Sequence, residues 1–197
     1  TGNQNTFVGG RAGAAGGNGG GTMNVGIGFW SLYATGTADA DYNTAVGAYS
    51  MENNTSGSSN VAVGYEALEE NTTGQFNVAV GRNALTTAST ASNNTAIGYN
   101  TLALNTTAQN NTAVGMNCLD ANTTGDDLVG VGQAALTDNT TGARNTAVGR
   151  QALTANTTGD NNTAVGQGVA DSITTGSENT AVGQGAGESI TTGSNNL

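Results

Sequence analysis

The residues Asn-Thr-Ala-Val-Gly at 43–47 form a phrase that recurs, with small changes, along the whole chain. The glycine that closes each phrase falls at positions 9, 28, 47, 64, 81, 98, 115, 132, 149, 166 and 183. The first two intervals are 19 residues and the following eight are 17. A fixed period this short predicts a solenoid, in which each unit contacts only its neighbours.

The phrase itself predicts a short β-strand, because β-branched residues alternate with alanine and a glycine follows. We expect Thr44 and Val46 to point into the solenoid and Ala45 to face outward. A second apolar row, mostly leucine, follows four residues after each closing glycine. We expect this second segment to be another short strand that brings its leucine back over the valine row. The predicted core is therefore Val46, Val63, Val80, Ile97, Val114, Val131, Val148, Val165, Val182, Leu68, Leu85, Leu102, Leu119, Leu136 and Leu153.

The return turn has the sequence Asn-Thr-Thr-Gly at 71–74, 122–125, 139–142 and 156–159. Its glycine suits a position with positive φ, and its Asn and Thr side chains can bond the local backbone. Stacked turns place equivalent amides about 4.8 Å apart, close enough for hydrogen-bonded ladders along the axis. The predicted structural ladder at the start of each phrase is Asn43, Asn60, Asn77, Asn94, Asn111, Asn145, Asn162 and Asn179.

These patterns predict an all-β parallel β-roll or β-solenoid of 17-residue repeats with about 11 turns. Residues 1–197 form a single repeat array, with irregular turns over 1–47 and regular repeats over 48–197. The two extra residues of the early units predict bulged loops within 16–23 and 37–42. Neither end carries an atypical capping repeat, so we expect the array to be a fragment of a longer protein.

Five departures from the consensus test this scheme. In the last two units the leucine position holds Ala170 and Gly187, while the asparagine of the return turn becomes Ile173 and Ile190. An apolar group lost at one position reappears three residues later, so we expect the isoleucine to fill the same space from the other side. In another unit, Leu128 interrupts the asparagine row.

The composition excludes several classes of partner. The net charge is −10, with 14 acidic residues against four arginines, which disfavours nucleic acid and anionic membranes. No apolar run approaches the length of a membrane span, so we expect no membrane insertion by this segment.

We expect no enzymatic activity and no cofactor. The chain has no histidine, and the adjacent acids Glu69-Glu70 and Asp126-Asp127 lie beside turns, where solvated carboxylates are common. No metal site is predicted, because Asp39 and Asp41 are fewer carboxylates than a calcium loop normally supplies. Cys118 occupies a position that other units fill with alanine, which indicates a buried residue rather than a reactive thiol.

Four aromatic residues, Phe29, Trp30, Tyr33 and Tyr42, cluster in the irregular second unit. They either fill a bulged turn or form a patch on which sugars stack. The small residues of the alanine row permit close approach of neighbouring chains, and we expect three chains to pack about a common axis.

The repeat resembles the head repeat of trimeric autotransporter adhesins and, more closely, the Asn-Thr-Ala-Val-Gly, Ala-Leu, Asn-Thr-Thr-Gly arrays of bacteriophage tail fibres and large bacterial surface proteins. This resemblance implies a left-handed parallel β-roll, a homotrimer or longer fibre, and an extracellular place on a cell or virion. We therefore expect a structural shaft that presents a receptor-binding region. The alternative is an adhesin module whose repeated loops bind a host-surface glycan or protein.

Overall fold

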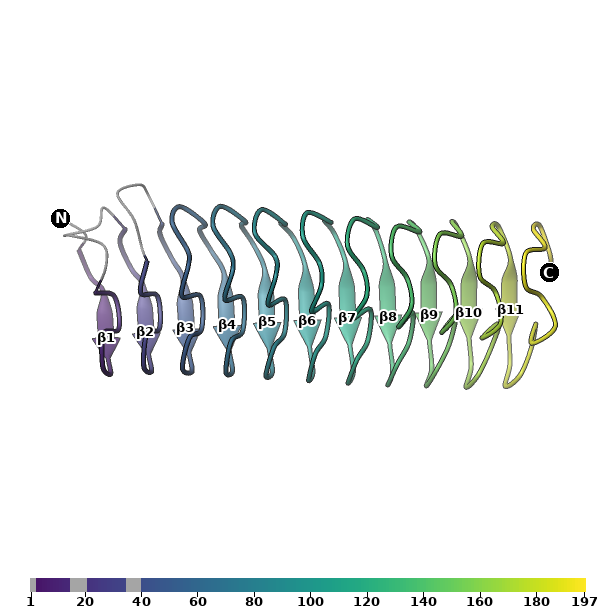
Figure 1. Ribbon diagram of the computed structural model, residues 1–197, viewed down its shortest axis with the longest axis horizontal. Coiled ribbons are helices and arrows are strands. Elements are labelled where there is room, and N and C mark those ends of the chain that lie inside the picture. The colour runs from purple at the N-terminus through teal and green to yellow at the C-terminus, as the bar shows by residue number, and fades with distance from the viewer. Residues whose placement is uncertain (1–2, 15–20, 35–39) are drawn as a thin grey trace.

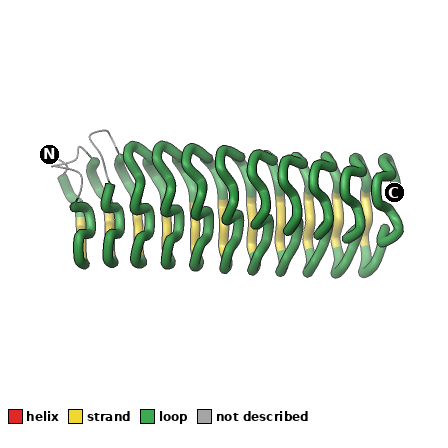
Figure 2. Tube along the Cα trace, viewed as in Figure 1, coloured by secondary structure: helices red, strands yellow, loops and turns green. Residues whose placement is uncertain are grey.

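The computed structural model describes residues 3–14, 21–34 and 40–197. Within these ranges the regular secondary structure consists of strands of three residues, and no helix occurs (Figure 2). The strands are β1 Thr6–Val8, β2 Val25–Ile27, β3 Thr44–Val46, β4 Val61–Val63, β5 Val78–Val80, β6 Thr95–Ile97, β7 Thr112–Val114, β8 Val129–Val131, β9 Thr146–Val148, β10 Thr163–Val165 and β11 Thr180–Val182. The predicted all-β solenoid is confirmed.

All eleven strands form one parallel sheet in sequence order, from β1 to β11. Equivalent residues pair in register, so that Thr44, Ala45 and Val46 lie beside Val61, Ala62 and Val63. Figure 1 shows the strands side by side along a straight axis, each joined to the next by one coil of chain. Each turn therefore contacts only the turns before and after it, as the fixed period predicts.

Hydrogen bonds between turns extend well beyond the strands. In the segment after the strand, the Leu68 N–H donates to the Ala84 carbonyl at 3.0 Å, and in the return turn the Thr72 N–H donates to Ser89 at 2.8 Å. On the way back to the strand, the Phe76 N–H donates to Ser58 at 3.2 Å. Because most of the coil is bonded axially, stacking fixes the backbone even where no strand is assigned.

The prediction of a second strand in each turn is wrong. The leucine positions adopt left-handed backbone geometry, with φ of 54° at Leu68 and 53° at Leu85. The residues two places earlier, Glu66 and Asn83, do the same at 55° and 58°. Alternation of this kind folds the segment into a compact corner, so it cannot be extended.

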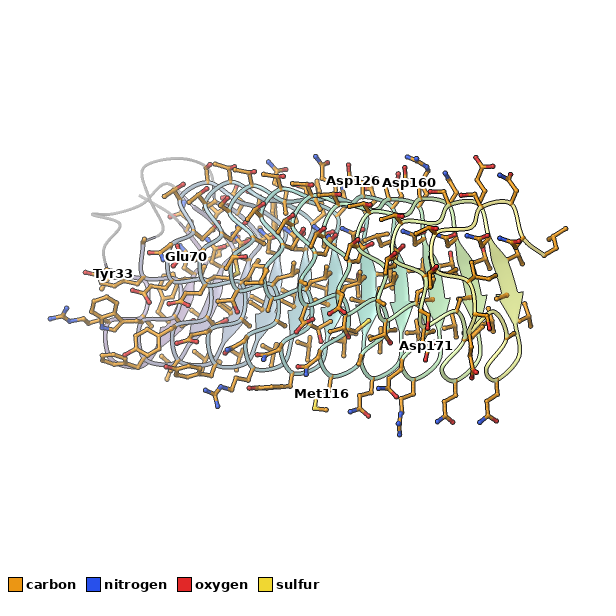
Figure 3. The ribbon with its side chains drawn as sticks, turned by 45° about the vertical axis from the view of Figure 1, so that its right-hand side comes forward. Tyr33, Glu70, Met116, Asp126, Asp160 and Asp171 are labelled. Atoms are coloured by element: carbon orange, nitrogen blue, oxygen red, sulfur yellow. The ribbon has the colours of Figure 1, made fainter. Side chains whose placement is uncertain are left out.

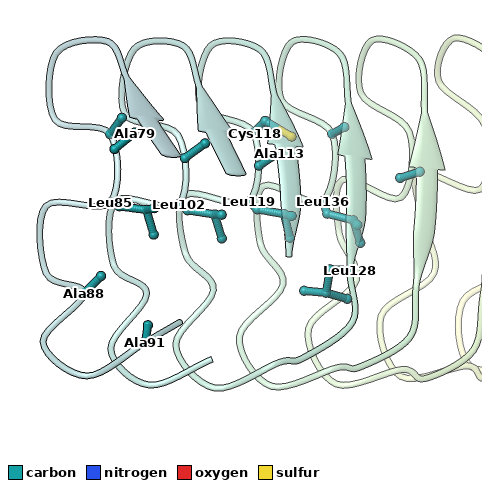
Figure 4. Packing of buried hydrophobic residues seen from close by; sticks show 14 of the residues in the cluster. Ala79, Leu85, Ala88, Ala91, Leu102, Ala113, Cys118, Leu119, Leu128 and Leu136 are labelled. Carbon is teal, nitrogen blue, oxygen red and sulfur yellow. The ribbon is translucent and has the colours of Figure 1, made fainter. Parts of the chain in front are cut away.

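The core is built from the alanine row of the strands and the leucine row of these corners. Ala45, Ala62 and Ala79 are fully buried, and so are Leu68 and Leu85. Figure 4 shows Leu85, Leu102, Leu119 and Leu136 following one another along the axis. The expected leucine members of the core all lie there, namely Leu68, Leu85, Leu102, Leu119, Leu136 and Leu153.

The expectation for the two faces of the strand is reversed. Ala45 points inward, whereas Thr44 and Val46 are only partly buried and lie on the outer face. The same holds along the sheet, where Val63 is 37 % exposed and Ile97 40 %. The core therefore does not include the valine and isoleucine row, which is Val46, Val63, Val80, Ile97, Val114, Val131, Val148, Val165 and Val182.

The reason is the narrow space between the strand and the leucine corner. Cys118 lies in the corner, and Gly130 replaces alanine in the neighbouring strand β8. A Cβ atom at Gly130 would lie only 2.6 Å from the Cys118 sulfur, so the sulfur fills the room that an alanine methyl would need. A space with so little tolerance has no room for a row of valines.

In the last two turns and in the first turn of the solenoid, a larger side chain likewise fills the space next to a smaller residue. Ile173 is fully buried, and the Ile190 Cδ1 atom lies 3.5 Å from where a Gly187 Cβ would be. These isoleucines thus reach the space vacated at the leucine position, as predicted. In the first turn, the Phe7 ring lies within 2.8 Å of the positions that Cβ atoms of Gly13 and Gly26 would take.

The two kinds of glycine differ in geometry. Gly47 closes its phrase with φ of 138°, and a Cβ there would collide with the Gly64 backbone of the next turn. The return-turn glycines were expected to have positive φ as well, and this is wrong: Gly74 is not among the residues with positive φ. Ala91 and Ala108 hold the equivalent position in other turns, consistent with ordinary backbone geometry there.

Candidate functional site

The asparagines that begin each phrase form a ladder along the axis. Asn60 Nδ2 donates to Gly74 O at 2.8 Å, and Asn60 Oδ1 accepts the backbone N–H of Asn77 at 2.9 Å. All the asparagines of this first ladder are almost completely buried, namely Asn43, Asn60, Asn77, Asn94, Asn111, Asn145, Asn162 and Asn179. Their amides are bonded inside the protein, so the first ladder holds the turns in register and is not a binding site.

A second ladder runs through the return turns. Asn139 Nδ2 donates to Asn122 Oδ1 at 2.9 Å and to Gly142 O at 3.0 Å, and Asn156 Nδ2 donates to Asn139 Oδ1 at 2.8 Å. Its members are Asn54, Asn71, Asn105, Asn122, Asn139 and Asn156. The recurrence of this turn indicates such a ladder, but these residues were not in the predicted set.

The outer face of the sheet runs along all eleven strands. Each strand places two side chains there, as Val61 and Val63 do in β4 and Thr95 and Ile97 do in β6. Over β2 to β11 these side chains are only threonine, valine and isoleucine. The face is therefore flat and uncharged, and valine or isoleucine follows every strand centre.

Charged residues lie on the coils instead of on this face. Figure 3 shows Asp126 and Asp160 along one edge of the solenoid, well away from Met116 on the opposite edge. Among the residues described, one ion pair occurs, between Arg144 and Asp160 at 3.3 Å, and both side chains are about half exposed. The charged side chains thus lie on the coils and not on the outer face of the sheet.

The paired carboxylates expected beside turns have structural partners. Asp126 Oδ1 accepts the Gln109 backbone N–H at 2.6 Å, and Asp127 Oδ1 accepts from Asn110 Nδ2 at 3.1 Å. Asp126 belongs to a row in which an acceptor side chain bonds the backbone of the preceding turn. The Ser92 hydroxyl does the same for the Gln75 N–H at 3.0 Å.

Glu69 and Glu70 belong to an acidic group with Glu52 and Glu66. Partial burial, together with the charges of Glu66, Glu70 and Glu52, raises the pKa of Glu69 to about 7. Burial also raises the pKa of Glu52, with Glu70 and Glu66 contributing. Because the folded chain disfavours the ionised form of Glu69, the folded state is most stable below the ordinary pKa of 4.5 and loses stability as the pH rises from there to about 7.

The aromatic residues of the second unit pack on one another. Trp30 stacks on Tyr33 with 4.2 Å between ring centroids, and Arg11 lies 5.4 Å from the Trp30 ring. Phe29 meets Tyr49 edge to face, and Tyr49 meets Tyr65 in the same way. Tyr42 is 58 % exposed. The contacts between rings favour a role in stacking the early turns over a free patch for sugars.

Two other predicted positions, Cys118 and Asp41, have clear places. Cys118 is buried, and burial raises the pKa of its thiol to about 12, so the thiol is unreactive in the folded chain. Asp41 Oδ1 accepts the Thr22 N–H at 2.6 Å. Asp39 and most of the two inserted loops within 16–23 and 37–42 lie outside the described residues. In the described ranges no three His, Cys, Asp or Glu side chains are grouped to hold a metal ion.

Comparisons with protein-family models, with characterised proteins and with solved structures find no match to this chain. No helix long and apolar enough to cross a membrane occurs among the described residues.

Proposed function

We propose that this chain is a structural shaft segment of a homotrimeric fibre on a cell or virion surface, where it presents a receptor-binding region. The observation that carries the proposal is the row of valine and isoleucine side chains that runs along the outer face of the sheet from β2 to β11. In the single chain Val63, Ile97 and Val165 remain 37 %, 40 % and 38 % exposed. Side chains of this kind, repeated at every turn, favour burial against a partner.

The size of the outer face can be compared with the apolar patches of single chains. Eleven strands at about 4.8 Å and three residues at about 3.3 Å give an area on the order of 500 Å². The largest apolar patch on a typical monomer is about 300–600 Å². The outer face thus lies within the range found on single chains, so its regular spacing, and not its size, carries the argument for a partner.

The regular spacing argues for copies of the same chain as the occupant. A partner can meet every valine or isoleucine along the face only if its own side chains advance by the same distance per turn. A second copy of this solenoid has that spacing by construction. Closed rings of identical subunits are also the usual form of soluble homo-oligomers, and the resemblance to trimeric fibres favours three.

This proposal keeps the predicted trimer but changes its interface. The small alanine row cannot be the contact between chains, because Ala62 and Ala79 are inside each chain. The interface is instead formed by β-branched side chains, which interdigitate well across flat sheets.

The oligomeric state in solution tests the proposal. Light scattering after size-exclusion chromatography is expected to give the mass of three chains. Val63→Lys and Val131→Lys introduce charge on the outer face, and the double variant is expected to be monomeric, because burying an unpaired ammonium is costly. Thr107→Lys, at an exposed position of a return turn, is the matched control and remains trimeric. A wild-type monomer or dimer would overturn the trimer, and a trimeric double variant would overturn the assigned face.

A further inference from the structure

A groove of about 370 Å³ crosses three consecutive turns on the side that follows the leucine corners. Asn83 and Asn100 lie along one wall, Asp120 lies in the third turn, and Ala103, Leu104 and Ala121 supply apolar surface. None of these residues belongs to a strand, so the groove is separate from the outer face of the sheet. Its volume lies near the lower limit for pockets that hold small molecules, about 300–1,000 Å³.

The groove lies where Ala103 occupies a position that larger side chains hold in the adjacent turns, Thr86 before it and Asp120 after it. The Thr86 hydroxyl donates to the Glu66 carbonyl at 3.4 Å, and the Thr137 hydroxyl donates to the Asn117 carbonyl of the preceding turn at 3.2 Å. Thr154 makes the equivalent contact with Ala134 at 3.4 Å. Ala103 has no hydroxyl to span the gap. The hollow is thus a local feature of this sequence and not a property of every turn.

Some polar atoms of the groove-lining residues lack partners inside the protein, whereas the Thr86 and Thr87 hydroxyls donate to backbone carbonyls. The Oδ1 atoms of Asn83, Asn100 and Asp120 are buried without a hydrogen-bond donor, and so is that of Asn117 in the next turn. A buried acceptor without a donor costs about 1–3 kcal/mol. Since no internal bond fixes which end of each amide faces the groove, Asn83 and Asn100 are able to donate or accept there.

This combination of groups matches the chemistry of a sugar. A pyranose ring has an apolar face of C–H groups and a rim of hydroxyls that both donate and accept hydrogen bonds. The amides recur once per turn, about 4.8 Å apart, and each ring of an extended oligosaccharide advances by nearly the same distance. Burial raises the pKa of Asp120, backbone hydrogen bonds from Ala121 and Asp120 oppose the shift, and the charge of Asp138 adds to it.

We propose that the groove between Asn83 and Asp120 binds a short, extended, neutral oligosaccharide, with one pyranose ring per turn. The rings lie on Ala103, Leu104 and Ala121, and their hydroxyls bond the amides of Asn83 and Asn100. The net charge of −10 disfavours sialylated and sulfated glycans at the same place. The site does not depend on the fibre, because its residues lie outside the sheet face.

A glycan array with neutral, sialylated and sulfated oligosaccharides identifies the probe, and calorimetric titration of the chain with the best neutral oligosaccharide gives the affinity. Asn100→Ala is expected to weaken binding at least tenfold, because one amide is lost. Ala103→Thr fills the groove with the residue that the preceding turn carries as Thr86, and binding is expected to disappear. Gln151→Ala, at the position equivalent to Asn100 three turns further on, is the matched control with unchanged affinity.

Folding of each variant is checked by its thermal midpoint. Ala134 and Thr137 already occupy the two substituted positions in another turn, so both variants are expected to melt like the wild type. Absence of binding to every neutral glycan, a preference for sialylated or sulfated ones, or wild-type affinity in Ala103→Thr would each overturn the site. Light scattering on the same samples separates the two proposals, because a trimer that binds no sugar contradicts only this one.

Discussion

The two asparagine ladders use the same side chain in different ways. In the first ladder, each Oδ1 accepts a backbone N–H of the next turn, as Asn60 Oδ1 does from Asn77 at 2.9 Å. In the second ladder, Oδ1 is met by the next side chain, as Asn139 Oδ1 is by Asn156 Nδ2 at 2.8 Å. The first ladder thus bonds the next turn through its backbone as well as through its side chain, as Asn77 Nδ2 also donates to Asn60 Oδ1 at 3.1 Å, whereas the second ladder bonds the next turn through the side chain.

This difference decides what an interruption costs. Leu128 interrupts the first ladder, yet its own N–H still donates to Asn111 Oδ1 at 2.8 Å. Ala88 and Ile173 interrupt the second ladder, and the oxygens before them, Asn71 Oδ1 and Asn156 Oδ1, are left buried without a donor. A ladder that depends on the backbone tolerates a foreign side chain, whereas one made of side chains leaves an unpaired group.

The largest expected effect is the loss of one amide from the regular part of the first ladder. Asn77→Ala leaves the Asn94 N–H and the Ala91 carbonyl without their bonds of 3.0 and 2.8 Å. At about 1–3 kcal/mol for each buried group, the free energy of unfolding in urea falls by roughly 3 kcal/mol. Thr90→Ala, at an exposed position, serves as control, and equal stability of the two variants would contradict the role of the ladder.

A smaller effect is expected where the second ladder ends at the exchanged isoleucine. Ile173→Asn offers a donor to Asn156 Oδ1 but removes a fully buried side chain, whose burial contributes about 1.5–3 kcal/mol. The single variant is therefore expected to be less stable by about 1–2 kcal/mol. Adding Ala170→Leu refills the space and restores most of the loss in the same urea titration. A double variant no more stable than the single one would show that the two positions do not share a space.

Repair of the internal gap is expected to stabilise the chain. Ala88→Asn places an amide where six other turns already bury one, and its Nδ2 meets the unpaired Asn71 Oδ1. The thermal midpoint is expected to rise, because the new hydrogen bond adds about 1–2 kcal/mol to the free energy of unfolding. Ala88→Leu adds similar bulk without a donor and is expected to destabilise. If both substitutions have the same effect, hydrogen bonding is not what the second ladder contributes.

The smallest effect is expected for repair of the first ladder. Leu128→Asn restores bonds to the Gly142 carbonyl and the Asn145 N–H, at about 1 kcal/mol each. It also removes a fully buried leucine, whose burial contributes about 1.5–3 kcal/mol. The restored hydrogen bonds and the lost burial nearly cancel, so the free energy of unfolding in urea is expected to change by no more than about 1 kcal/mol. A large change in either direction would remove the contrast between the ladders.

The period, the leucine row and the first ladder could all be predicted from the sequence, because each depends only on which residues recur. The inward face of the strand could not. Alternation separates Ala45 from Thr44 and Val46 but does not say which side is inside, and the larger side chains were placed there. The narrow space next to Leu68, which only the folded corner defines, admits alanine instead.

The groove could not be predicted for a related reason. Ala103 differs from Thr86 and Thr137 by two heavy atoms, a change that a surface position normally accepts without consequence. Only the stacking of turns shows that the missing hydroxyl opens a space beside Asn83 and Asn100. The left-handed geometry at these asparagines was equally hidden, since a strand was expected there.

The buried thiol of Cys118, in the seventh turn, provides a way to measure local opening of the solenoid. Cys118 is the single cysteine of the chain, it is fully buried, and its pKa is raised to about 12. A thiol reagent can modify it only after this turn separates from its neighbours. The rate of labelling under native conditions therefore measures how often the middle of the rod opens, at one known place and without any added probe.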